Sequence, residues 1–284
     1  MHKNNLHIQD YDFQKLCSEY PQLKEFVFTS KYEKKTINFA YPKAVKALNT
    51  ALLKTYYNIN YWSFSDDSLC PPIPSRVDYI HQLNDLLNES GITQNIKILD
   101  IGSGASCIYP LLGNAVNNWK FIGTEIDNNS LNSAQKIINE NNLNESIKLR
   151  FQSEKSNILN DVITETDMFS ASMCNPPFYS SQEEANESNN RKMKGLGIDS
   201  SIRNFSGSQN ELWYEGGEKA FLHNYLYQSS LFKTQCHWFT SLVSKTENVQ
   251  PMYDSLKKLN ATQIETKSIK LGNKITRIVA WSFM

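Results

Sequence analysis

The chain has 284 residues, of which 40% are hydrophobic and 20% are charged, with 29 basic and 29 acidic side chains. This length allows one large α/β domain with an extension or two small domains, and the composition excludes disordered and collagen-like classes. The first residues lack the apolar core of a signal peptide, and no run of about 18 apolar residues occurs. We therefore expect a cytoplasmic protein with no membrane contact.

Residues 1–75 are predicted to form a mainly helical segment. Within residues 41–58 apolar side chains recur at helical spacing, at Val45, Leu48, Leu52 and Tyr56. Such spacing buries one face of a helix and leaves Lys43 and Lys46 largely outward. The proline-rich run 70–74 is expected to be a stiff connector that breaks regular structure, and a helix is predicted to resume over 77–88.

From residue 96 the pattern changes to short apolar strands separated by helices. Strands are predicted at 96–101, 119–126, 146–151, 168–174, 236–243, 262–270 and 275–283, and helices at 130–141, 218–232 and 249–259. This alternation is typical of a doubly wound parallel sheet, and the tight link at 271–274 predicts a final hairpin. The expected fold is α/β, a Rossmann-like class I methyltransferase domain over residues 76–284. Its mostly parallel seven-stranded sheet has an antiparallel last strand.

A glycine-containing loop follows the first of these strands. Asp100 begins it, and Gly102 and Gly104 allow the backbone to pass close to a ligand near a helix N-terminus. The third glycine of a dinucleotide fingerprint is replaced by Cys107, which leaves nicotinamide binding open but less well supported. Glu125, near the end of the next strand, is positioned to accept hydrogen bonds from ribose hydroxyls. A solvated carboxylate is the alternative.

The stretch Asn175–Pro176–Pro177–Phe178 follows another predicted strand. The Asn175 side-chain oxygen and the Pro176 carbonyl can accept both hydrogens of an exocyclic amino group and leave its lone pair free. Phe178 can stack on the base. The alternative is an ordinary Asn-Pro turn. A thiol nucleophile for a pyrimidine carbon, Cys174, is also conceivable, although we interpret it as a core residue.

The glycine loop, the acidic residue and the Asn-Pro-Pro-Phe stretch all follow strands, so they meet at the carboxyl edge of a doubly wound sheet. The combination indicates an amino methyltransferase that uses S-adenosyl-L-methionine and releases S-adenosyl-L-homocysteine. The five cysteines and five histidines show no metal-ligand spacing, so we expect no metal.

The polar stretch 180–210 is expected to be a flap that orders on substrate rather than an inert insertion. It contains Arg191, Lys192 and Lys194. Both ends of the chain are basic: residues 1–60 carry nine lysines against five acidic side chains, and residues 233–284 carry eight basic against three acidic ones. This pattern fits terminal segments that contact phosphates, or simply solvated lysines on helix faces.

The chain resembles the bacterial ribosomal RNA large-subunit methyltransferase F family and, more distantly, the methyltransferase-like 16 proteins. The likeness runs nearly end to end. It is carried by residues 38–40, 44–48, 70–72, 76, 78–81, 100–102, 105–110, 174–178, 215–218, 238–244 and 280–281. The resemblance implies transfer of a methyl group to N6 of a specific adenine in 23S ribosomal RNA, presented as RNA or as a large-subunit precursor, by a monomeric enzyme.

The resemblance also implies roles for individual residues. Arg76 is expected to contact the methionyl carboxylate of the donor, although an ion pair with a nearby aspartate is the alternative. The donor site is expected to include Asp100, Gly102, Gly104, Glu125 and Asn175. The base is expected to contact Asn175, Pro177 and Phe178. Ser156 stands where the distant relatives have a threonine that contacts the adenine end of the donor. Glu215 and Glu218 could cap the following helix or contact substrate.

Contacts to RNA phosphates are predicted for residues of the N-terminal segment and the flap, namely Lys3, His7, Lys43, Lys46, Arg191, Lys192 and Lys194. Two other readings stay open at this point. The same amino-group chemistry could act on DNA adenine, a small RNA or a glutamine amide. The chain could also be a largely non-catalytic RNA-binding relative.

Overall fold

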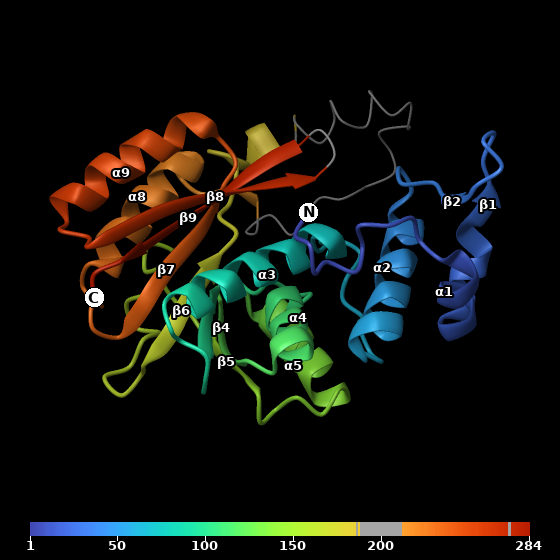
Figure 1. Cartoon of the computed structure of the whole chain (residues 1–284), viewed down its shortest axis with the longest axis horizontal. Coiled ribbons are helices and arrows are strands. Elements are labelled where there is room, and N and C mark those ends of the chain that lie inside the picture. The colour runs from blue at the N-terminus through green and yellow to red at the C-terminus, as the bar shows by residue number, and fades with distance from the viewer. Residues whose placement is uncertain (186, 188–211, 272–273) are drawn as a thin grey trace.

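The computed structural model describes residues 1–185, 187, 212–271 and 274–284. A seven-stranded sheet forms the body, helices cover both of its faces, and a smaller group of N-terminal elements stands beside it (Figure 1). No helix in the described ranges is long and apolar enough to cross a membrane. The cysteines Cys17, Cys70, Cys107, Cys174 and Cys236 all carry free thiols.

The central sheet confirms the predicted fold. Its strands are β3 (Lys97–Ile101), β4 (Lys120–Glu125), β5 (Ile147–Phe151), β6 (Phe169–Cys174), β7 (Cys236–Val243), β8 (Gln263–Leu271) and β9 (Lys274–Ser282). They are ordered β5-β4-β3-β6-β7-β9-β8, and only β9 runs against the others. The order reverses direction between β3 and β6, which is where a doubly wound sheet opens a crevice for ligands.

Each face of the sheet has its own hydrophobic core. The helices α3 (Ile73–Glu89), α4 (Ile108–Asn117) and α5 (Asn128–Glu140) pack with Ile98 of β3, whereas α8 (Gly217–Ser229) and α9 (Val249–Lys258) pack with its neighbour Leu99. Successive side chains of a strand point to opposite faces. The strands β3 and β6 are therefore buried on both sides.

The N-terminal elements are more varied than the predicted helical segment. They comprise α1 (Phe13–Glu19), the 3₁₀ helix η1 (Pro21–Phe26), an antiparallel hairpin of β1 (Val27–Thr29) and β2 (Lys35–Ile37), and α2 (Pro42–Tyr57). The predicted stripe of α2 is partly wrong, because Val45 and Tyr56 are only half-buried. Leu53 and Tyr57 are buried in their place and pack into the core beneath α3 and α4.

The prolines before α3 begin that helix instead of separating it from the preceding chain, which corrects the predicted connector. Pro72 is the N-cap residue, and Pro74 lies in the first turn. The first amides of a helix have no intrahelical acceptor, so proline loses nothing there. The expected boundary between residues 75 and 76 falls within this same turn.

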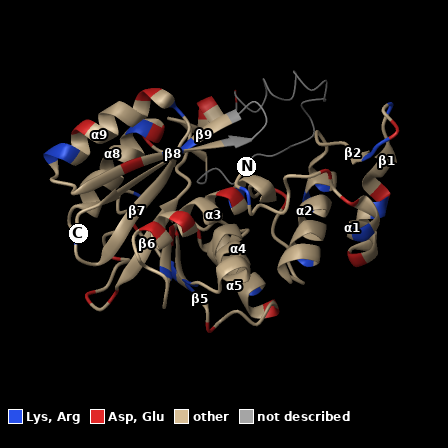
Figure 2. Cartoon of the chain, in the orientation of Figure 1, with Lys and Arg blue, Asp and Glu red and all other residues tan. Residues whose placement is uncertain are grey.

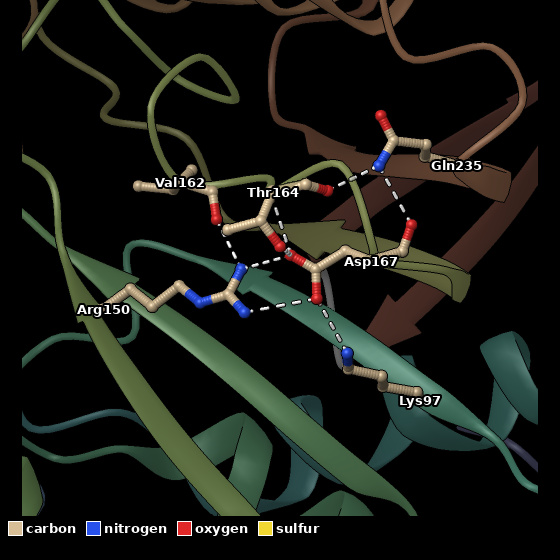
Figure 3. A network of polar contacts seen from close by, with 6 residues as sticks. All are labelled: Lys97, Arg150, Val162, Thr164, Asp167 and Gln235. Carbon is tan, nitrogen blue, oxygen red and sulfur yellow. Dashed lines mark hydrogen bonds and ion pairs between the residues drawn. The ribbon is translucent and has the colours of Figure 1, made fainter.

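A polar network closes the amino end of the sheet (Figure 3). Asp167, which precedes β6, accepts hydrogen bonds from Lys97 at 2.9 Å and from Arg150 and Thr164. Gln235, which precedes β7, donates to the backbone oxygens of Thr164 and Asp167. The network joins β3, β5, β6 and β7 at the edge opposite the crevice.

Candidate active site

The carboxyl ends of β3, β4 and β6 surround a cavity of about 140 Å³. Six of the residues predicted from the sequence line it: Arg76, Gly102, Gly104, Glu125, Asn175 and Pro177. They come from four separate segments of the chain, and the parallel strands bring them to one edge. Of the remaining predicted residues, Asp100 and Pro176 are buried behind the wall, and Phe178 is half-buried beside it.

The loop after β3 depends on glycine at two positions. Gly102 has a φ of 72° and Gly104 a φ of 64°, and L side chains rarely adopt such left-handed values. Within the described residues, and apart from its chain neighbours, no heavy atom lies within 4 Å of a Cβ built on Gly102. The backbone of Gly102 therefore borders open space in the cavity wall, where a ligand can approach it closely.

Glu125 fixes this loop to the next strand. Its Oε2 atom accepts a hydrogen bond from the Gly104 amide at 2.9 Å, and its Oε1 atom accepts from the amides of Ile126 and Asp127. The side chain is 6% exposed and lines the cavity. Glu125 thus holds the loop at the cavity wall with a carboxylate, the kind of group that ribose hydroxyls hydrogen-bond.

Arg76 enters the cavity from the first turn of α3. Its guanidinium carbon lies 5.5 Å from the centre of the Tyr109 ring. The Nε atom of Arg76 and the hydroxyl of Tyr109 are buried without a hydrogen-bond partner among the described residues. Buried polar atoms normally have partners. The two orphaned donors therefore mark a position for an anionic group of a ligand.

Asp100 lies directly behind the same wall and is 1% exposed. Its Oδ2 atom accepts from the Ser103 hydroxyl at 2.7 Å, while Oδ1 has no hydrogen-bond partner in the described part of the chain. Burial raises the pKa of Asp100 to about 7, the Ser103 hydrogen bond opposes this shift, and Glu125 adds to it. A cation bound nearby would favour the ionised form.

The Asn-Pro-Pro-Phe stretch is held from below by buried hydroxyl groups. Tyr79 of α3 hydrogen-bonds Thr240 of β7 at 2.7 Å, and the Cys174 amide donates to the Tyr79 hydroxyl at 3.4 Å. Thr240 in turn donates to the carbonyl of Ser172. These contacts fix the end of β6, so Asn175 leaves the sheet at a defined point on the cavity wall.

The segment after the undescribed region returns to this stretch. The amides of Phe178 and Tyr179 both donate to the Leu212 carbonyl at 3.1 Å, and Trp213 forms a parallel bridge with Tyr179. The ammonium of Lys155 lies 3.5 Å from the centre of the Trp213 ring. Sequence reasoning missed Trp213 and Lys155 as lining residues. The only signal for Trp213 was its position just before the Glu-Gly-Gly turn.

Other predicted residues lie outside the cavity lining. Ser156 is exposed, and its carbonyl accepts from Asn224 and Gln228, while its neighbours Lys155 and Asn157 line the cavity. Glu218 is buried and accepts from Ser244, Lys245 and Asn248. Glu218 lies in the first turn of α8, where a carboxylate suits the positive end of the helix as expected. Its hydrogen bonds also fix the loop after β7.

The residues predicted to contact RNA phosphates differ in exposure and in their partners. His7 is 5% exposed and bonds the Tyr57 hydroxyl at 2.8 Å, and burial lowers the pKa of His7 to about 4. A buried, neutral His7 offers no cation to a phosphate, which speaks against that prediction. Lys46 pairs with Asp66 at 2.8 Å, whereas Lys3 and Lys43 are exposed. Arg191, Lys192 and Lys194 lie outside the described residues.

The strand order with one inserted antiparallel strand, the glycine loop and the acidic residue after the second sheet strand together define the class I methyltransferase fold. A family described as RNA methyltransferase matches residues 1–284, and the chain belongs to this family.

Individual relatives agree with this assignment. Ribosomal RNA large subunit methyltransferase F of Christiangramia forsetii is 47% identical over 100% of both chains. The protein of the same name from Pectobacterium atrosepticum is 44% identical over 100% of this chain and 93% of its own length. The catalytic domain of hMettl16 in complex with MAT2A 3'UTR hairpin 1 superposes with a TM-score of 0.86 at 32% identity, covering 100% of this chain and 96% of that one.

A structure of the N-terminal domain of human METTL16 in complex with SAH also superposes, with a TM-score of 0.81 at 29% identity. The superposition covers 100% of this chain and 99% of that one.

Proposed function

We propose that this protein transfers the methyl group of S-adenosyl-L-methionine to N6 of a specific adenine in 23S ribosomal RNA. The observation that carries the proposal is the position of Asn175 on the wall of the same cavity as Arg76 and Glu125. In this arrangement the Asn175 amide would bind the amine beside the methyl donor. Support for a ribosomal substrate comes from the 47% identity to a ribosomal RNA large subunit methyltransferase F.

The residues present fit the methyl donor. The unpartnered Nε of Arg76 suits the methionyl carboxylate, and the Glu125 carboxylate on the cavity wall suits the ribose hydroxyls. Asp100, with its unpartnered Oδ1 atom, would supply a negative charge near the methionyl ammonium. The bound sulfonium supplies an already activated methyl group, so the protein has to position the amine and protect its lone pair.

Asn175 and Pro176 would supply that positioning. Their carbonyl oxygens accept the two N6 hydrogens in a tetrahedral arrangement, which withdraws the nitrogen lone pair from conjugation with the ring. The lone pair then forms the new carbon–nitrogen bond while the sulfur–carbon bond breaks, and one N6 proton leaves to water. Phe178 stacks on the adenine and holds its plane.

The target adenine has to leave its stack to enter the cavity, at a cost of about a few kcal/mol. An unpaired or loosely structured RNA site lowers that cost. Exposed Lys3 and Lys43 are placed to contact the flanking phosphates, and we extend this role to the basic residues 191–194 of the flap. The division into an RNA-contacting segment 1–75 and a catalytic domain 76–284 belongs to the same proposal.

A small structured RNA is a second candidate substrate. The specific observation in its favour is the TM-score of 0.86 to a catalytic domain bound to an RNA hairpin. The chemistry at Asn175 would be the same. The two candidates differ only in which RNA carries the labelled methyl group.

The experiment is transfer of radiolabelled methyl from S-adenosyl-L-methionine to total RNA from a strain that lacks the gene, followed by separation of the RNAs and nucleoside analysis. We expect label in 23S RNA as N6-methyladenosine. Label in small RNA alone would favour the second candidate. Label on another atom, or none on RNA or precursor particles, would contradict the proposed chemistry.

A further inference from the structure

Exposed aromatic side chains are concentrated in the β1–β2 hairpin and the turn that leads into α2. Six Phe and Tyr side chains are classed as exposed in the described residues, and four of them lie between residues 28 and 41. Phe28 is 49% exposed, Tyr32 73% and Phe39 54%. Exposure of aromatic side chains to water is unfavourable, and exposed rings add nothing to the hydrophobic core of the protein. Their clustering in one short segment therefore points to a ligand.

Lysines alternate with these aromatic residues. Lys31, Lys35 and Lys43 are exposed, and the ammonium of Lys31 lies 5.0 Å from the centre of the Tyr32 ring. Residues 24–43 carry five lysines and two glutamates. Figure 2 shows basic residues on β2 and along α2. We call Phe28, Tyr32 and Phe39 with Lys31, Lys35 and Lys43 the aromatic–lysine segment.

The aromatic–lysine segment is connected to the wall of the active-site cavity. Asn49 of α2 donates to the Pro71 carbonyl at 3.0 Å, and Pro71 lines the cavity. Lys43 precedes Asn49 by less than two turns of α2, about 9 Å along the helix axis. The ring of Tyr41 contacts Phe26 at the base of the hairpin, with 5.8 Å between ring centres. The segment thus continues outward from the cavity wall along α2.

We propose that the aromatic–lysine segment binds unpaired nucleotides that flank the target adenine. Bases stack on Phe28, Tyr32 and Phe39, and phosphates contact Lys31, Lys35 and Lys43. Aromatic rings alternating with cations are what single-stranded nucleic acid requires, since every base has a π-face and every linkage a negative charge. Paired bases are already stacked, so a duplex gains nothing from the rings. The inference rests on the proposed RNA substrate and adds the strandedness of the flanking RNA.

The test measures binding of a labelled single-stranded RNA, and of a duplex containing the same strand, by fluorescence anisotropy. Tyr32→Ala should weaken single-strand binding about tenfold and leave duplex binding unchanged. Tyr227→Ala is the matched control, because Tyr227 is 55% exposed on α8, and it should bind like wild type. Thermal unfolding curves and S-adenosyl-L-homocysteine affinity should be unchanged in both variants.

Two further variants separate base stacking from other contacts. Tyr32→Trp keeps a stacking surface and should bind at least as tightly as wild type, whereas Tyr32→Leu should bind as weakly as Tyr32→Ala. Wild-type affinity in Tyr32→Leu, or in a Phe28→Ala, Tyr32→Ala, Phe39→Ala triple variant, would overturn the inference. An equal loss of duplex and single-strand binding would overturn it as well. Wild-type affinity in these variants would instead favour an apolar protein surface as the occupant, and an equal loss would indicate RNA contacts that do not depend on base stacking.

The lysine contacts are tested separately, through the salt dependence of RNA affinity. Replacement of Lys31, Lys35 and Lys43 by glutamine should reduce the slope of log affinity against log salt by about 2, while Lys120→Gln, on an exposed lysine at the amino end of β4, should not. An unchanged slope in the triple variant would exclude phosphate contacts. Failure of the proposed function is distinguishable, because wild-type protein would then methylate no RNA even if the segment bound single strands.

Discussion

Two buried aspartates at opposite ends of the sheet have opposite surroundings. Asp167, at the amino end, is 3% exposed and accepts hydrogen bonds from Lys97, Arg150 and Thr164. Asp100, at the carboxyl end, is 1% exposed and has one acceptor atom without a partner among the described residues. Burial raises the pKa of both. At Asp167 the Arg150 and Lys97 contacts outweigh burial and hold its pKa well below the usual range, whereas at Asp100 the pKa stays near 7.

Buried polar groups therefore have different roles at the two ends of the sheet: at one end they stabilise the fold, and at the other they are available to a ligand. At the amino end the buried charge has its partners inside the protein, so the network contributes to stability. At the carboxyl end Arg76, Asp100 and Tyr109 keep unpartnered atoms around a cavity. Unsatisfied buried groups cost free energy in the unliganded protein. A charged ligand that completes them regains that cost as binding free energy.

The largest effect is expected from Asp167→Asn. This change leaves Lys97 and Arg150 partly buried without a counter-charge and should lower the free energy of unfolding by about 3 kcal/mol. Asp10→Asn, in the exposed pair with Lys34, should leave the free energy of unfolding nearly unchanged. Chemical denaturation measures both. Equal losses in the two variants would mean that the amino-end network is not a major source of stability.

The same variant has a pH signature. Because the folded pKa of Asp167 lies below its unfolded value of about 4, wild-type stability from this group is present above pH 4 and is lost as the pH falls below it. Asp167→Asn should lack that part of the acid dependence. Methyl transfer per folded molecule should match wild type.

At the carboxyl end, Asn175→Ala should lower turnover about 100-fold, equivalent to about 2.7 kcal/mol of transition-state stabilisation. Its unfolding curve and S-adenosyl-L-homocysteine affinity should stay close to wild type, because Asn175 acts on the amine. Asn139→Ala, at an exposed position of α5, is the control. Turnover within a factor of about two of wild type in Asn175→Ala would show that another group positions the amine.

A pair of glycine substitutions tests whether a ligand approaches the backbone of Gly102. Gly102 and Gly91 both have positive φ, 72° and 74°, and neither Cβ would meet an atom within 4 Å. Alanine at either position should cost about 1–2 kcal/mol of stability from backbone strain. Only Gly102→Ala should also weaken S-adenosyl-L-homocysteine binding, since its methyl group would occupy the cavity wall. Calorimetric titration that gives equal affinities for both variants would place the ligand elsewhere.

Asp100→Asn should change how stability depends on pH. A carboxyl whose folded pKa is raised to about 7 contributes stability that is lost as the pH rises from about 4 to 7. The variant should therefore lose less stability than wild type over this interval. It should also bind S-adenosyl-L-homocysteine more weakly above pH 7, where the wild-type carboxylate is ionised. A parallel pH dependence in both proteins would show that Asp100 does not titrate in this range.

The sequence predicted the sheet well because its central strands β3, β6 and β7 are short segments buried along nearly their whole length. The loop after β3 and the stretch after β6 were located for the same reason, since parallel strands deliver their carboxyl ends to one edge. The β1–β2 hairpin could not be predicted, because its strands have three residues each and Phe28 and Lys35 are exposed. Such a segment carries no burial pattern.

The parts of the site that sequence reasoning missed depend on long-range packing. Trp213 joins the wall through a backbone bridge to Tyr179 across the undescribed region. His7 was assigned to the surface from its charge type, yet the ring packs beside Tyr57 of α2. Neither contact has a local signature in the sequence, because the partners are far apart in the chain and meet only in the folded protein.

The central claim is that the unpartnered groups at the carboxyl end receive a methyl donor whose sulfur faces Asn175. A crystal structure of the protein with S-adenosyl-L-homocysteine tests it most directly. We expect the ligand carboxylate on Arg76, the ribose hydroxyls on Glu125, and the sulfur oriented toward the Asn175 amide across a gap that admits an adenine. A ligand bound outside this cavity, or a sulfur turned away from Asn175, would contradict the account.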